Sequence, residues 1–266
     1  MNIHLFDGVA SEYTTEVSPY RHAQFLAMVH EMKLDGTEHI LDIGCGPGVL
    51  SLEAAARLPK GRLTGIDLSP RMLDLARDLA YKAGYRNVRY ELGDAMNLNY
   101  ADGKFDYVMS SNAFPWVSSR TKFLAEVRRV LKPGGRLALV SLSHIVYREF
   151  IDALLHVSEK YPELNGLKTD PYRAMKVRLY DADRLSEKVA SAGFEISRGF
   201  ILSTEEPITP AGYIKRVNSV VNENYLDNLD DRIKEDIRNE IFLALARKNG
   251  SLKVTESSVF VFARKK

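Results

Sequence analysis

Three glycines and one aspartate are the residues whose spacing first suggests chemistry. Gly44, Gly46 and Gly48 stand in one five-residue stretch between an apolar run and a run with helical spacing. Glycine lets a backbone turn tightly and approach a ligand, and the N–H groups that begin the next helix suit an anionic ligand group. Asp67 closes the next apolar run, about 20 residues after Gly48, the separation expected of an acid that binds the hydroxyls of an adenosine ribose. These residues predict a cofactor that carries adenosine.

The residues after the glycines weaken two phosphate-binding interpretations of the turn. The dinucleotide fingerprint has glycine or alanine three residues after its second glycine, whereas Val49 stands there. A P-loop ends in Gly-Lys-Ser/Thr, whereas Gly48 is followed by Val49 and Leu50. A nicotinamide-dependent oxidoreductase therefore stays open as an alternative, but a disfavoured one.

Strand-like and helix-like runs alternate along the chain in the way that positions such a turn. The helical runs lie at 49–58, 70–83, 120–131 and 181–192. Alternation at this spacing predicts a parallel sheet with helices on both faces, and ligands of such sheets bind at the carboxyl ends of the strands. The strand-like runs are 39–43, 62–67, 88–92, 105–110, 136–142, 194–202 and 257–263.

Two segments interrupt the alternation in the later part of the chain. Residues 144–180 carry apolar residues at helical spacing, and residues 205–249 contain an apolar stripe from Leu229 to Leu245 that repeats every fourth residue. Such a stripe is typical of an amphipathic helix. We expect one domain over 1–266, with these two segments either docked as helices on the sheet or forming a helical cap over the binding site. The cap is the interpretation that we favour.

Composition limits the class of protein and its partners. The chain has 266 residues, of which 45% are hydrophobic and 27% charged, and its formal net charge of +2 does not by itself imply a nucleic-acid partner. Cys45 is the only cysteine, so an intrachain disulfide and a four-cysteine zinc site are excluded. We find no signal peptide, no apolar run long enough to span a membrane, and no metal-ligand spacing. We therefore expect a soluble, cytoplasmic protein without a metal, and its oligomeric state stays open.

Five motifs follow one another in a characteristic order: ILDIGCGPG (40–48), GIDLSPRML (65–73), GDAMNL (93–98), FDYVMSSNAFPWV (105–117) and FLAEVRRVLKPGGRLAL (123–139). With them the chain resembles a class I S-adenosylmethionine-dependent methyltransferase of the small-molecule type, and its core is similar to quinone-biosynthesis and malonyl-carrier methyltransferases. The resemblance implies a doubly wound, seven-stranded, mostly parallel sheet of the Rossmann-like methyltransferase fold, which 194–265 closes with an antiparallel hairpin. It also implies S-adenosylmethionine as cofactor and S-adenosylhomocysteine as product.

The resemblance assigns cofactor-binding roles. Asp42 and the glycine turn would line the methionine end of the cofactor, Asp67 would hold both ribose hydroxyls, and Asp94 would accept the adenine amino group. Core packing is the alternative role for Met72 and Met96. The full set implied is Tyr13, Asp42, Gly44, Cys45, Gly46, Gly48, Asp67, Leu68, Met72, Gly93, Asp94, Ala95, Met96, Ser110 and Ser111.

A second group of residues is expected at the acceptor. Asn112 would border the acceptor and Trp116 would form a wall of its site. His144 follows a strand and is the candidate general base, with a strand cap or a solvent-facing side chain as its alternative role. The cap tyrosines Tyr147, Tyr172 and Tyr213 would line an apolar acceptor pocket, unless they serve as packing.

The predicted reaction is methyl transfer to an oxygen or carbon of a small apolar or metabolite acceptor. The strand-end sequence SSNAFPWV lacks the motif of enzymes that methylate amino groups of nucleic acids, which argues against DNA as the acceptor. The core motifs leave one alternative within the same fold: an enzyme that binds the same cofactor and catalyses a non-methylating reaction such as cyclisation.

Overall fold

The computed structural model describes residues 19–143, 147–168, 180–221, 226, 229–248, 250 and 252–266. Their strands form one seven-stranded sheet in the order β3-β2-β1-β4-β5-β7-β6, which confirms the predicted fold class. The strands are β1 (His39–Ile43), β2 (Arg62–Asp67), β3 (Val88–Leu92), β4 (Phe105–Ser111), β5 (Leu131–Leu142), β6 (Phe194–Pro207) and β7 (Lys253–Lys265).

The order of the strands reverses beside β1. Strand β1 pairs in parallel with β2 on one side and with β4 on the other, and β2–β3 and β4–β5 are parallel as well. Strands β6 and β7 run in opposite directions, because Ser197 contacts Phe262 while Gly193 contacts Lys266. The carboxyl ends of β1 and β4 therefore meet at the switch point, where open α/β sheets bind their ligands.

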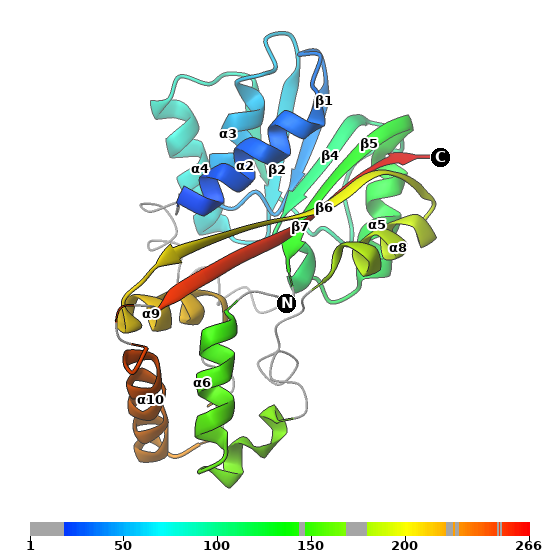
Figure 1. Cartoon of the computed structure of the whole chain (residues 1–266). Coiled ribbons are helices and arrows are strands. Elements are labelled where there is room, and N and C mark those ends of the chain that lie inside the picture. Colours follow the sequence, from blue (N-terminus) through cyan, green and yellow to red (C-terminus); the bar gives the residue numbers. More distant parts are fainter. Residues whose placement is uncertain are drawn as a thin grey trace. The chain divides into compact units, whose positions relative to one another are not determined.

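Helices cover both faces of the sheet (Figure 1). Helices α2 (Pro19–Met32), α3 (Val49–Ala55) and α4 (Pro70–Lys82) lie on one face, while α5 (Arg120–Val130) and α8 (Ala182–Ser191) lie on the other. The short helix η1 (Phe114–Trp116) follows β4. The start of α4 is set by Ser69, whose hydroxyl accepts the amide of Met72, and by Pro70 in its first turn. Helix α2 was not predicted.

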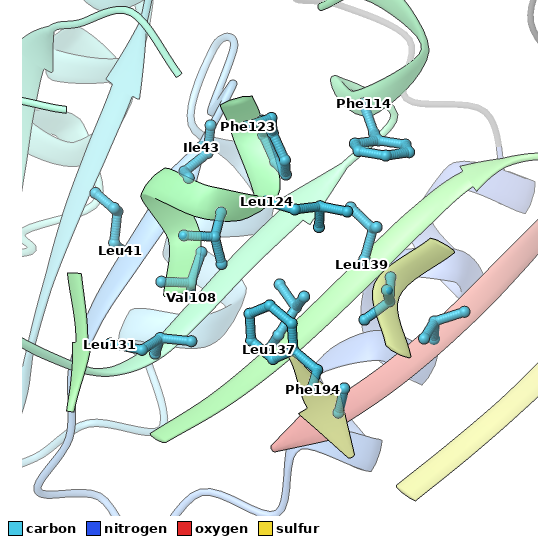
Figure 2. Close-up of a cluster of buried hydrophobic side chains, with 14 of the residues drawn as sticks. Leu41, Ile43, Val108, Phe114, Phe123, Leu124, Leu131, Leu137, Leu139 and Phe194 are labelled. Carbon is cyan, nitrogen blue, oxygen red and sulfur yellow. The ribbon is translucent and has the colours of Figure 1, made fainter. Parts of the chain in front are cut away.

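The largest apolar cluster lies between the sheet and the pair α5 and α8. Figure 2 shows Phe123 and Leu124 of α5 beside Val108 and Leu139 of the strands, all 1% exposed or less. Burial at this level stabilises the fold by about 1.5–3 kcal/mol for each large apolar side chain. This packing fixes the strands whose ends carry the site.

Strand β5 begins earlier than the predicted 136–142. Its pairing with β4 passes from Phe105–Leu131 to Tyr107–Arg136, so the residues between bulge out of the ladder. Gly134, at φ 70°, lies in this bulge. The KPGG segment that reads as a turn in the sequence is an irregularity inside one strand.

The described residues divide into two compact units. The first lies within Met1–Ser141, Tyr180–Leu202 and Ser258–Lys266, and the second within Leu142–Leu179 and Ser203–Ser257. The second unit corresponds closely to the two predicted insertions, 144–180 and 205–249. Its helices are α6 (Arg148–Ser158), η2 (Pro162–Leu167), α9 (Pro210–Val221) and α10 (Asp231–Ala246).

Helices α6 and α10 pack on each other in the second unit. Leu154 and Val157 of α6 and Ile237 of α10 are fully buried there, and Lys160 pairs with Glu240 at 2.8 Å. The amphipathic stripe predicted between 229 and 245 is thus confirmed as α10. Among the described residues no helix is both long and apolar enough to cross a membrane.

Candidate functional site

The glycine turn at the end of β1 is fastened to the end of β2. The Gly44 and Cys45 amides both donate to the carbonyl of Ile66, and the Gly46 amide donates to Oδ2 of Asp67 at 2.9 Å. The other carboxylate oxygen, Oδ1, accepts the Ser69 amide at 2.9 Å. Two backbone amides thus fix the Asp67 carboxylate beside the turn. The structure brings together the two features whose spacing predicted a ribose site.

Two positions of the turn need glycine for different reasons. Gly48 has φ 83°, and a Cβ there would lie 2.5 Å from the hydroxyl oxygen of Tyr90. Gly46 has φ 53°, but a Cβ there would have no described atom within 4 Å. Gly48 is therefore required by the packing below the turn. Gly46 instead borders open space, where a ligand can approach the backbone.

Asp42 of β1 lies below this turn, next to helix α3. Its side chain is 1% exposed, and Oδ2 accepts the hydroxyl of Ser51 at 2.6 Å. Burial raises the pKa of Asp42 from its ordinary 3.8 to about 7; the Ser51 hydrogen bond lowers the pKa and the charge of Asp67 raises it. A buried carboxyl with this pKa gains its charge most readily when a cation lies near it.

The segment after β3 carries the residues expected around the adenine. Asp94 Oδ1 accepts the amide of Met96 at 2.9 Å, and the Asp94 carbonyl accepts the amide of Asn97. No hydrogen bond from a described residue reaches Asp94 Oδ2, so this oxygen is available as an acceptor. Ala95 and Met96 are half-buried and pack against the main core.

The end of β4 is tied both to the turn and to α2. Ser110 is fully buried and donates to the carbonyl of Ile43 at 2.9 Å. Asn112 adopts φ 58°, unusual for a residue other than glycine, and its Nδ2 donates to Gln24 of α2 at 3.3 Å and more weakly to Ser111. Its Oδ1 is buried and has no hydrogen-bond partner among the described residues. A strained residue with an unmet acceptor is a frequent sign of a functional position.

Other predicted residues shape the site from below. Cys45 and Met72 are buried, Cys45 beside Tyr90 and the residues of α4. Leu68 is half-exposed next to Asp67, and Trp116 is half-exposed in η1. Gly93 follows β3, and its amide donates to the carbonyl of Asp67.

The predicted cap residues fall outside this first unit. Tyr147 and Tyr213 belong to the second unit, where both are buried and their rings lie 6.4 Å apart. The Tyr213 hydroxyl donates to Glu149 at 2.9 Å. Tyr13, His144 and Tyr172 lie outside the described residues.

Three buried polar residues near the turn were missed by sequence reasoning. Ser51 reaches Asp42 from α3, Tyr90 supports Gly48 from β3, and Gln24 of α2 donates to Ser258 at 2.5 Å while accepting from Asn112. A polar residue inside an amphipathic pattern carries no signal of its partner. For Ser51 the sequence offers one hint of its contact with Asp42, because Ser51 lies about one helical turn after the last glycine of the turn.

The arrangement fits an adenosine cofactor with a positively charged end. Gly46 leaves an open cradle, Asp67 stands beside it with a carboxylate oriented by backbone amides, and Asp94 offers an acceptor oxygen. Asp42 and Asp67 place two carboxyl groups at one turn, which suits a sulfonium and disfavours a diphosphate. The residues present thus offer the carboxylate oxygens and the open stretch of backbone that suit S-adenosylmethionine.

Comparison with known proteins agrees with this geometry. Residues 40–135 match the family described as "Methyltransferase domain". The demethylmenaquinone methyltransferase of Symbiobacterium thermophilum is 34% identical over 212 residues, which cover 71% of this chain and 83% of that protein. The enzyme of the same name from Deinococcus radiodurans is 43% identical over 103 residues, 38% of this chain and 42% of that one.

Solved structures show the same fold at low identity. A putative methyltransferase from Bacillus halodurans has a TM-score of 0.62 and 22% identity, with 90% of this chain and 98% of that chain covered. The [4+2]-cyclase SpnF has a TM-score of 0.59 and 22% identity, with 94% and 84% covered. Fold, site and the long match to the Symbiobacterium enzyme lead to one conclusion: the chain belongs to the class I S-adenosylmethionine-dependent methyltransferases, and it is an enzyme that methylates a small molecule.

Proposed function

We propose that this methyltransferase acts on an oxygen or carbon atom of a small, apolar, quinone-like acceptor. The observation that carries the proposal is the 34% identity to a protein named demethylmenaquinone methyltransferase along 83% of its length. That name gives the acceptor of the relative. A match over most of the relative, beyond the cofactor-binding core alone, supports a related acceptor here.

The residues of this chain would mainly orient the cofactor and the acceptor and exclude water. The bound cofactor supplies an electrophilic methyl group on a sulfonium. The glycine turn would hold the methionine end of the cofactor, Asp67 its ribose and Asp94 its adenine, with Leu68, Ala95 and Met96 around the adenine ring. Alignment of two reactants can be worth about 7–11 kcal/mol of barrier, so a displacement of this kind needs little further help.

An acceptor that carries a proton on the attacking atom, or on a conjugated hydroxyl, needs a group to hold that proton. We propose that Asn112 Oδ1, a buried oxygen at the end of β4 with no hydrogen-bond partner among the described residues, takes a hydrogen bond from the hydroxyl of the methyl acceptor. His144 remains the proposed general base. Ser110 and Ser111 would fix the strand end that presents Asn112.

The test uses S-adenosylmethionine with a labelled methyl group and a short-chain demethylmenaquinone analogue in its reduced form. We expect label in the quinone fraction and one equivalent of S-adenosylhomocysteine released. Asp67→Asn serves as the control, because it should lose most of the cofactor affinity while its amide oxygen can still accept one of the two backbone amides that Asp67 binds.

Other results would redirect the assignment. Label from a cell extract in another small molecule, with none in the quinone analogue, would contradict the quinone-like acceptor. Label in protein or RNA would contradict a small acceptor altogether. Bound cofactor with no release of S-adenosylhomocysteine on any fraction would favour the non-methylating alternative.

A further inference from the structure

Three polar side chains from three elements meet in the interior below the glycine turn. They are Asp42 of β1, Ser51 of α3 and Tyr90 of β3, which are 1%, 0% and 7% exposed. The Ser51 hydroxyl donates to Asp42 Oδ2 at 2.6 Å, and Ser51 is also close enough to the phenol of Tyr90 to lower its pKa. The three groups thus lie next to one another and form one buried polar row.

The far end of this row touches the turn itself. The Tyr90 hydroxyl donates to the carbonyl of Gly48 at 3.4 Å. A Cβ on Gly65 would lie 2.7 Å from the ring of Tyr90, so the ring is held tightly on this side as well. The row therefore connects the buried carboxyl to the backbone that borders the cofactor.

The charges that face Asp42 are of one sign. The charge of Asp67 on β2 raises the pKa of Asp42, and the charge of Asp42 in turn raises the pKa of Cys45 in the turn and of Tyr90 on β3. Arg77 of α4 acts on the Cys45 thiol and is not among the groups that shift the pKa of Asp42. Among the described residues, no cation therefore compensates an ionised Asp42.

The Ser51 hydroxyl can reorient, so that the row forms hydrogen bonds both when Asp42 is ionised and when it is protonated. When Asp42 is ionised, Ser51 donates to it. When Asp42 carries a proton, that proton is donated to Ser51, and the Ser51 hydrogen turns to the phenol oxygen of Tyr90, which continues to donate to Gly48. Each hydroxyl donates one hydrogen in both arrangements, so no group loses its partner.

We infer that Asp42, Ser51 and Tyr90 couple cofactor binding to a proton, so that the affinity for the positively charged methyl donor, relative to that for the neutral thioether product, rises with pH. The inference rests on the cofactor assigned above. Asp42 gives up its proton to solvent when a sulfonium binds at the turn and keeps it when S-adenosylhomocysteine binds. Ser51 and Tyr90 are positioning residues, since they act through Asp42.

The sign of the effect follows from linkage. A ligand that binds best to the ionised form releases protons, and its affinity rises with pH until the free site is ionised. For a midpoint near the pKa of about 7, affinity for S-adenosylmethionine should rise about tenfold between pH 6 and pH 8. Affinity for S-adenosylhomocysteine should change much less.

The experiment is isothermal titration calorimetry of the full chain with each of the two compounds, from pH 6 to 8.5, in buffers of different ionisation enthalpy. The number of protons released is expected to be larger for S-adenosylmethionine. Asp42→Asn should abolish the protein's share of the pH dependence, and what remains reports the cofactor's own α-amino group.

Two further variants should move the midpoint in opposite directions. Ser51→Ala removes the hydrogen bond to the carboxylate and should shift the midpoint to higher pH. Tyr90→Phe keeps the ring below Gly48 but removes the acceptor needed by the protonated form, and should shift it to lower pH. Ser141→Ala is the matched control and should leave the profile unchanged, because Ser141 is a fully buried serine of β5 that has no hydrogen-bond partner in the described part of the chain.

The outcomes separate this inference from the assignment on which it rests. Equal proton release for both compounds, or midpoints that Ser51→Ala and Tyr90→Phe leave in place, would overturn the inference while the cofactor assignment stands. A folded protein that binds neither compound would overturn the cofactor assignment, and the inference with it.

Discussion

Asp42 destabilises the protein without cofactor at neutral and alkaline pH, because its charge is buried. Its pKa is raised in the folded state, from 3.8 to about 7, so folding stability falls as pH rises through this window and the full cost is present above it. At about 1.4 kcal/mol for each pKa unit, the cost is on the order of a few kcal/mol.

Asp42→Asn should therefore raise the free energy of unfolding at pH 8 and lose this advantage near pH 4. Urea denaturation at the two pH values measures the difference, and Ser51→Ala should change stability at pH 8 in the opposite direction. An Asn variant that is less stable at pH 8 would show that the carboxylate is stabilised by something other than Ser51.

Two glycines two residues apart should respond differently to the same substitution. In Gly48→Ala a residue other than glycine must adopt a left-handed backbone conformation, which costs about 1–2 kcal/mol. Its Cβ also lies 2.5 Å from Tyr90, so the total loss of stability should be larger than this backbone cost. Gly46→Ala meets no described atom and should cost only the backbone part, yet lose most affinity for S-adenosylmethionine. Thermal unfolding and calorimetric binding on both variants decide this, and normal binding by Gly46→Ala would move the cofactor away from the turn.

Asn112 should matter to the acceptor more than to stability. Asn112→Gly suits the positive φ of 58° and removes the buried Oδ1, but it also breaks the 3.3 Å hydrogen bond to Gln24. The free energy of unfolding should therefore fall by about 1–3 kcal/mol at most. We expect kcat/KM for the acceptor to fall at least tenfold, with the Kd of S-adenosylmethionine unchanged. Steady-state kinetics with an identified acceptor tests it, and unaltered kinetics would remove Asn112 from the acceptor site.

At the scale of elements, one arginine of α5 holds the segment that carries Asp94. Arg129 donates to the carbonyls of Tyr100 and Leu98 and pairs with Asp102, while its neighbour Glu126 accepts the Leu98 amide. Lysine cannot reproduce this fork of donors. Arg129→Lys should lower stability by about 1–3 kcal/mol and weaken S-adenosylmethionine binding several-fold.

The control for that change is Arg128→Lys, one residue earlier on the same helix and without a hydrogen bond to the segment in the described structure. Calorimetry and urea denaturation on both variants give the comparison. Lower stability with full affinity in Arg129→Lys would mean that the adenine segment is positioned by β3 alone.

Most elements could be predicted from the sequence, because strands buried between helices appear as short apolar runs. Strands β1, β2 and β3 begin and end where predicted. Helix α2 was missed, since its buried Gln24 interrupts the apolar stripe formed with Met28 and Met32. The beginning of β5 was missed because a proline and two glycines normally end a strand. Partners far apart in the chain, such as Tyr90 below Gly48, could not be predicted because local patterns hold no information on them.

At the scale of the whole molecule, the two units divide the proposed roles. The described cofactor residues, from Asp42 to Ser111, belong to the first unit, and the family match at 40–135 falls within it. The second unit is built from the two insertions and has its own buried residues, among them Tyr213 and Ile241. A core that binds the donor and a separate unit that serves the acceptor would allow the acceptor to change while the donor stays the same.

Tyr213→Phe tests this division. The change removes only the hydroxyl that donates to Glu149 at 2.9 Å and leaves the buried ring beside Tyr147 in place. If the second unit serves the acceptor, kcat/KM for the acceptor should fall while the Kd of S-adenosylmethionine stays within about twofold of the parent, because a substitution in one unit leaves a site built in the other intact. A parallel loss of cofactor affinity would contradict the division, since it would require that the two units bind the cofactor together.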